Sequence, residues 1–223
     1  MKRFLVVLSL LIAPVTLVFG QGERAVLPFE GVVEFKLQNI ESVQFFEMYV
    51  KGERVRTQTK EKLDYVPILI QDYATQTSFI MVTATERYVQ VPLPGGGTES
   101  EKQVSGVEQT GEKETIAGLP CEQFIVKLNE GELEVWATLA LGKVAGFSRS
   151  LNQENSKQPT WESYFSSRGY AALRAIVYNG EGHEEGRYEV TKVTRKAVPE
   201  SQFRVPRGYD KVAEQKDLIQ RRR

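Results

Sequence analysis

Short stretches in which apolar and polar residues alternate recur along most of this chain. The alternation is clearest in residues 30–37, where Val33, Phe35 and Leu37 share one face and charged residues occupy the other. A period of two residues is typical of a β-strand with one buried face. The repeated pattern therefore predicts a protein built mainly from β-strands.

Tight turns separate several pairs of these stretches, and each pair predicts a β-hairpin. Lys51-Gly52 and Asn179-Gly180 are the clearest turns, because glycine permits the backbone angles that two-residue loops need. A single strand is also expected over residues 66–73. The four predicted hairpins pair residues 46–50 with 54–57, 78–82 with 87–91, 122–128 with 132–138, and 172–178 with 187–196.

Helical periodicity replaces the strand pattern between residues 139 and 169. Residues 139–152 have apolar groups at helical spacing, and a second helix is expected to begin at Thr160 and end at Gly169. The resulting expectation is a mainly β (α+β) fold: a curved antiparallel sheet, or open half-barrel, with two helices at 139–169 acting as a lid.

The first twenty residues have the pattern of a secretory signal peptide. Met1-Lys2-Arg3 is basic, residues 4–13 are apolar, and Val18-Phe19-Gly20 resembles a cleavage site. An uncleaved anchor is the alternative, but Pro14 interrupts the run, which is shorter than the ~20 residues a spanning helix needs. We therefore expect a periplasmic or secreted protein with no transmembrane segment after cleavage.

The rest of the chain is expected to form one domain. An N-terminal extension (21–29) precedes a single β domain (30–209), and a charged tail (210–223) follows it. Within the domain, residues 92–109 are glycine-rich at the start, polar, and without an apolar period, so they predict a mobile surface loop.

Charge and cysteine content exclude some classes of function. Basic and acidic residues are equal at 29 each, and loss of Lys2 and Arg3 on cleavage would leave 27 against 29. This balance lacks the excess positive charge of a nucleic-acid-binding protein. Cys121 is the single cysteine, so it forms no intramolecular disulfide, and we expect it to be a buried structural residue.

Candidate catalytic residues are sparse. His183, the only histidine, lies among glutamates in a predicted turn and has no zinc-binding motif around it. Gly146-Phe147-Ser148-Arg149-Ser150 lacks the last glycine of a nucleophile elbow. We therefore predict a non-catalytic protein with no cofactor and no metal. A hydrolase that uses His183 or Cys121 is the weaker alternative.

The stretch Thr110–Glu122 follows the pattern T-G-E-x-x-T-I-x-G-[YL]-x-C-E. It resembles the central motif of an uncharacterised bacterial domain family with a LolA-like fold, that of periplasmic lipoprotein carriers. Further matching pieces are Glu134-Val135-Trp136, Leu141-Gly142, Val50–Arg56 and Ser201–Tyr209. The resemblance implies a curved antiparallel sheet closed on one side by helices, and it supplies no catalytic or cofactor residues.

A set of large apolar residues is the candidate ligand-binding surface. One hypothesis is that the concave face of the sheet binds a lipid, an acyl chain, or a lipidated or apolar partner such as a lipoprotein. The alternative is a filled core in a structural or protein-interaction module of the cell envelope, with strand edges or the 92–109 loop as the contact surface. The candidate lining residues are Phe35, Phe46, Met48, Ile68, Ile70, Phe79, Met81, Trp136, Phe147, Trp161 and Phe165.

Overall fold

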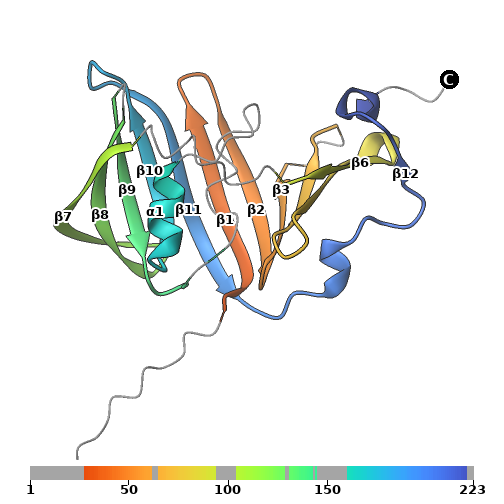
Figure 1. Ribbon diagram of the computed structural model, residues 1–223, viewed down its shortest axis with the longest axis horizontal. Coiled ribbons are helices and arrows are strands. Elements are labelled where there is room, and N and C mark those ends of the chain that lie inside the picture. The colour runs from red at the N-terminus through yellow and green to blue at the C-terminus, as the bar shows by residue number, and fades with distance from the viewer. Residues whose placement is uncertain are drawn as a thin grey trace, which may run out of the picture.

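A computed structural model describes residues 28–61, 65–93, 104–128, 131–142, 144 and 160–219, and these residues form one sheet, antiparallel except at its β12 edge, with few helices (Figure 1). The helical elements are η1 (Thr83–Thr85), α1 (Thr160–Ser167), η4 (Glu200–Phe203) and η5 (Gln215–Ile219). The strands are β1 (Glu30–Asn39), β2 (Val43–Lys51), β3 (Arg54–Thr59), β4 (Ile68–Asp72), β5 (Thr77–Val82), β6 (Arg87–Pro92), β7 (Val104–Ile116), β8 (Leu119–Leu128), β9 (Glu132–Thr138), β10 (Ala171–Tyr178), β11 (Glu184–Arg195) and β12 (Asp210–Lys211).

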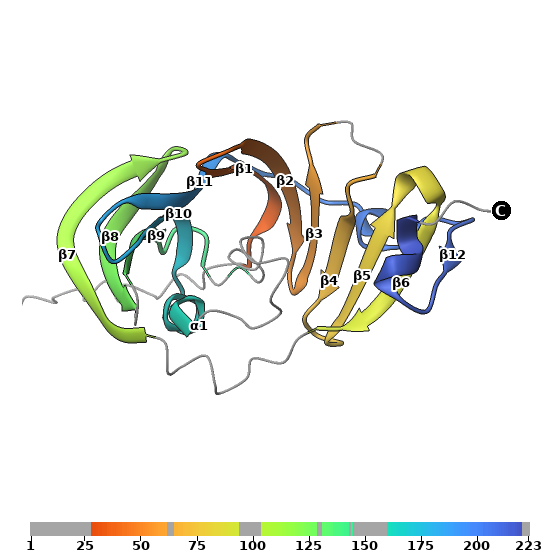
Figure 2. The same cartoon turned by 90° about the horizontal axis from the view of Figure 1, so that it is seen from above.

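The strand order is β12-β6-β5-β4-β3-β2-β1-β11-β10-β9-β8-β7. β1 lies in the middle and pairs with β2 on one side and β11 on the other. The two edge strands, β7 and β12, do not pair with each other, so the sheet is open. Figure 2 shows that β7 to β11 curve around α1, which lies on the concave side. The mainly β, curved and open architecture is therefore confirmed.

The four predicted hairpins are present in the structure. They are β2–β3, β5–β6, β8–β9 and β10–β11. Gly52 adopts a φ of +58° in the first turn, and Gly131 adopts +89° in the third. A β-carbon on Gly131 would lie 2.1 Å from the Tyr178 carbonyl oxygen, so the third turn requires glycine for space as well as for backbone angle.

The predicted surface loop at 92–109 is wrong at both ends. Pro92 belongs to β6, and residues 104–109 begin β7, which pairs with β8. The start of β7 was not predicted as a strand because β7 is an edge strand with charged residues and has a register shift between Gln109 and Lys113. Residues 94–103 lie outside the described residues.

Only the second of the two helices predicted for the lid is present among the described residues. Helix α1 is present, and Gly169 follows it with a φ of +78°. The first predicted helix does not begin at Leu139, because Leu139–Gly142 form a turn in which the Gly142 amide donates to the Leu139 carbonyl at 3.0 Å. Gly142 has a φ of +68°, which is incompatible with a right-handed helix. Most of the remaining predicted helix lies outside the described residues, and the two-helix lid is not confirmed.

The charged tail is part of the fold as far as Ile219. β12 pairs in parallel with β6, and the Asp210 and Val212 amides donate to the Glu86 and Tyr88 carbonyls at 2.8 Å. Leu218 in η5 is 2% exposed. Residues 210–219, predicted to be a charged tail, therefore pack on the sheet, because apolar groups are spaced between the charges.

Candidate binding site

Strand register assigns the apolar side chains to two faces of the sheet. Residues directly opposite each other on neighbouring strands point to the same face. Phe46 lies opposite Phe35, and Met48 lies opposite Val33, so these four side chains share one face. Tyr188 on β11 packs beside Phe35 and extends this face toward β10 and α1. We call it the inner face because it is the side of the sheet on which α1 lies.

Helix α1 covers the inner face near β8 and β10. The ring of Phe165 meets the ring of Phe124 on β8 edge-on, with 5.0 Å between centroids. Trp161 contacts Phe165 at 6.1 Å, and both are buried. Aromatic pairs in this geometry add to the stabilisation from burial. The helix is therefore held to the sheet by an aromatic cluster.

The inner face continues over β1, β2 and β3 as a floor of apolar side chains. Phe35 stacks on Phe46 with 5.3 Å between centroids and 13° between ring planes. Met48, Val50 and Val55 belong to the same buried cluster, and each is at most 1% exposed. The inner face is thus apolar from β3 through β1 to β8.

Four of the predicted lining residues lie on the opposite, outer face. The register pairs Tyr49 with Arg56, Arg56 with Ile70, and Ile70 with Phe79, so these side chains share one face. Met48 is the neighbour of Tyr49 on β2 and therefore points to the opposite, inner face. A separate apolar cluster forms there beneath the segment that contains Val198 and Phe203. The outer-face members of the predicted set are Ile68, Ile70, Phe79 and Met81.

Trp136 also points away from the inner face. It lies opposite Arg174, whose guanidinium carbon is 6.0 Å from the indole centroid. Its indole N–H donates to Glu134 at 2.6 Å. Phe147 lies outside the described residues. The structure therefore brings together five of the eleven candidates on the inner face: Phe35, Phe46, Met48, Trp161 and Phe165.

The outer face around Trp136 carries an ion network. Arg174 donates to both carboxylate oxygens of Glu114, at 2.7 and 3.0 Å, and to Glu189 at 3.1 Å. The hydrogen bond from Arg174 lowers the pKa of Glu114 below its usual value. The sheet is thus polar outside and apolar inside over β9 to β11.

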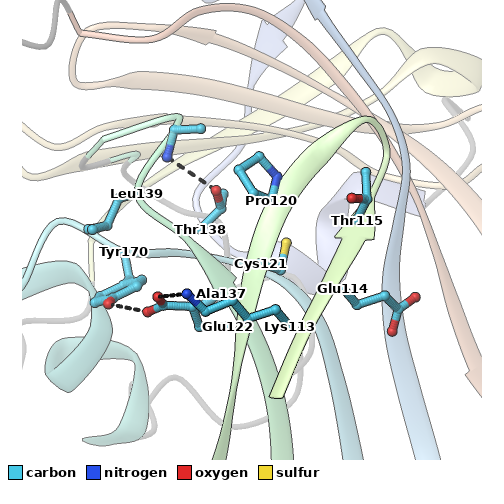
Figure 3. Close-up of a pocket in the computed structure, with 11 residues that line it drawn as sticks. Lys113, Glu114, Thr115, Pro120, Cys121, Glu122, Ala137, Thr138, Leu139 and Tyr170 are labelled. Atoms are coloured by element: carbon cyan, nitrogen blue, oxygen red, sulfur yellow. Dashed lines mark hydrogen bonds and ion pairs between the residues drawn. The ribbon is translucent and has the colours of Figure 1, made fainter. Parts of the chain in front are cut away.

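A pocket of about 410 Å³ lies where β9 ends beside β7 and β8 (Figure 3). The Tyr170 hydroxyl donates to Glu122 at 2.7 Å, and Gln109 donates to the same carboxylate oxygen at 3.1 Å. Burial raises the pKa of the Cys121 thiol to about 11. The lining residues are Lys113, Glu114, Thr115, Pro120, Cys121, Glu122, Ala137, Thr138, Leu139, Ala140 and Tyr170.

Sequence reasoning did not identify this pocket, although the signal was present. Six of its lining residues fall within Thr110–Glu122, the stretch that carries the family resemblance. The other wall comes from residues 137–140, between the two neighbouring motif pieces at Glu134-Val135-Trp136 and Leu141-Gly142. The motif pieces lie apart in the sequence, and only folding shows that they border one pocket.

The candidate catalytic residues are not assembled into a cluster in the described part of the chain. His183 is exposed, and its Nδ1 lies 3.5 Å from a Glu181 carboxylate oxygen. No group of three or more histidine, cysteine, aspartate or glutamate side chains among the described residues could hold a metal ion. No described helix is both long and apolar enough to cross a membrane.

These features define a class of protein: an open, curved antiparallel sheet with an apolar inner face and a polar outer face. The chain belongs to the family described as a domain of unknown function, DUF4412, whose model matches residues 29–209. The resemblance found in the sequence is thereby confirmed. A search of curated protein sequences gave no match.

Two solved structures show a similar fold at low sequence identity. An uncharacterised conserved protein from Thermus thermophilus is 12% identical with a TM-score of 0.54, over 83% of this chain and 91% of that one. PNGF-II is 16% identical with a TM-score of 0.51, over 85% of this chain and 32% of that one, so the likeness spans about a third of PNGF-II. A more distant match is a putative outer membrane lipoprotein-sorting protein domain from Vibrio parahaemolyticus, 11% identical with a TM-score of 0.31, over 78% and 87%.

Proposed function

We propose that this protein is a non-catalytic, exported envelope protein that binds an acyl chain, or a lipidated or apolar partner, against the inner face of its sheet. The observation that carries the proposal is the apolar inner face, which extends from Val55 on β3 across β1 to Phe124 on β8. Binding of this kind needs no covalent chemistry, because removal of apolar surface from water supplies the driving force.

The burial of the inner face sets the strength of such binding. Phe35, Met48 and Val55 are already shielded from water. A ligand would therefore exchange one set of apolar contacts for another at this floor. Most of its gain would come from its own surface leaving water, at roughly 25 cal/mol per Å². Ligands with long apolar chains should bind better than short ones.

Two neighbouring residues on β2 provide a matched test. Phe46 lies on the inner face, whereas Phe45 points to the outer face and is 44% exposed. Phe46→Glu places a charge on the apolar floor and should abolish uptake of a fluorescent fatty acid, because a buried unpaired charge is costly. Phe45→Glu should leave uptake unchanged. If Phe46→Glu fails to fold, Leu37→Glu at a half-buried inner position replaces it.

Native mass spectrometry of the mature protein gives a second measurement. A lipid that co-purifies with the wild type and is lost in Phe46→Glu supports the proposal. Equal fatty-acid uptake by the wild type and both variants would contradict it. The same spectrum tests export, because cleavage of the proposed signal peptide lowers the measured mass by the mass of residues 1–20.

A protein-interaction role has one observation in its favour. The turn that joins β1 to β2 and the start of β2 present exposed apolar residues: Ile40 is 86% exposed and Val43 is 45% exposed. Exposed apolar patches commonly mark contact surfaces. Ile40→Lys should then weaken partner capture or self-association in sedimentation measurements and leave fatty-acid uptake unchanged.

A further inference from the structure

We infer that the pocket between β7, β8 and the end of β9 binds a cationic group carried on an apolar stem, such as an alkylammonium or the side chain of lysine or arginine. This site adjoins the β8 end of the inner face, because Glu122 lies on the same side of β8 as Phe124, and the inference does not depend on the proposed function. Its geometry is shown in Figure 3.

The part of the lining that a ligand can touch is mostly apolar. Leu139 is 52% exposed, Pro120 and Ala140 are also exposed, and Tyr170 is half-buried. Cys121, which is 1% exposed, lies beneath this surface. The exposed apolar groups match an alkyl stem. A volume of about 410 Å³ is near the lower end of small-molecule sites, and it fits one or two side chains.

A fixed carboxylate stands on the pocket wall. Tyr170 and Gln109 both donate to Oε2 of Glu122, which holds the carboxylate in one orientation. The ring of Tyr170 is itself packed at 5.3 Å against Phe124, so the orienting hydroxyl belongs to a rigid cluster. Glu122 is thus positioned before any ligand arrives.

The second carboxylate oxygen of Glu122, Oε1, can accept a hydrogen bond from a ligand. Oε1 lies 3.9 Å from Lys113 Nζ, beyond hydrogen-bond distance, and the Lys113 side chain is 75% exposed. An exposed ion pair of this length contributes little. A ligand ammonium at Oε1 would form a shorter, charge-assisted hydrogen bond in a less exposed setting.

The charged side chains of the lining determine which ligand charge is favoured. The lining contains two carboxylates, Glu114 and Glu122, and one cation, Lys113. Arg174 engages both oxygens of Glu114 from outside the lining, so Glu122 is the carboxylate that remains to meet a ligand. A cationic ligand is therefore favoured over a neutral or anionic one of the same shape.

The test is an NMR titration of the full mature chain with three probes of similar shape: n-butylammonium, 1-butanol and butyrate. Butylammonium should shift the amide signals of the pocket residues at millimolar concentration, and the other two should not. Glu122→Gln keeps a group that can accept from Tyr170 and removes the charge, so it should weaken butylammonium binding about tenfold. Tyr170→Phe, which removes one of the two hydrogen bonds that orient the carboxylate, should have a smaller effect in the same direction.

Controls and a second ligand source complete the experiment. Glu181→Gln, at an 81%-exposed carboxylate, should leave binding unchanged. N-acetyl-lysine methylamide shows whether a side chain within a polypeptide fits as well as a free amine does. Absence of shifts with both amines, equal shifts with butanol or butyrate, or unchanged binding in Glu122→Gln would each overturn the inference.

Discussion

Phe165 on α1 and Phe124 on β8 meet edge-on, with 5.0 Å between their ring centroids. This contact joins the one α-helix of the described residues to the inner face of the sheet. Phe165 also contacts Trp161, Tyr164 and Tyr170, so a single ring organises the cluster.

Phe165→Ala should lower the free energy of unfolding by about 3 kcal/mol, because the truncation leaves a cavity in a buried aromatic cluster. Urea denaturation followed by circular dichroism measures the change. Arg168→Ala provides the control, since Arg168 lies over the exposed side of the helix, 3.7 Å from the centroid of Tyr164. A similar loss in both variants would show that Phe165 does not hold the helix to the sheet.

Leu218→Ala should destabilise the protein by about 2–3 kcal/mol, because Leu218 in η5 packs against Val82 on β5 and Val89 on β6. Leu218 is 2% exposed, while the neighbouring Ile219 is 62% exposed, so Ile219→Ala is a matched control. Thermal unfolding of the two variants and the wild type distinguishes them. A tail that was merely a solvated end would give no difference between Leu218→Ala and Ile219→Ala.

Glu200 should make stability depend on acid pH. Hydrogen bonds from Arg54 and Lys51 lower its pKa from 4.5 to about 2. An acid whose pKa is lower in the folded state stabilises the fold above its unfolded pKa, and that contribution is lost as pH falls from about 4.5 to 2. In Glu200→Gln the midpoint of urea unfolding should therefore change less with pH in this window than it does in the wild type. Glu181→Gln should keep the wild-type slope.

Cys121 should react slowly with alkylating reagents in the folded protein. Its thiol is 1% exposed, and burial raises its pKa to about 11, so little thiolate exists at neutral pH. The rate should increase sharply in denaturing urea and should increase with pH up to about 11. Rapid labelling of the native protein at neutral pH would contradict the described burial.

The β1 and β2 strands and their neighbours show what could be predicted from sequence. Alternation at Val33, Phe35 and Leu37 is set by the pleat of one strand, and the turn at Lys51-Gly52 is set by the backbone freedom of glycine. Both are local properties, so neighbouring residues suffice to determine them. The motif in Thr110–Glu122 is likewise a run of adjacent residues, and it is enough to indicate the family.

Ile70 and Phe35 show what the sequence alone determined and what only the tertiary structure decided. Each residue was predictable as apolar and on the buried side of its own strand. Strand register, together with the C-terminal segment that contains Phe203, placed them on opposite faces of the sheet. In the same way, residues far apart in the sequence formed the Glu122–Tyr170 pocket. Local patterns determine strands and turns because they depend on adjacent residues, whereas faces and pockets depend on which distant segments cover each strand.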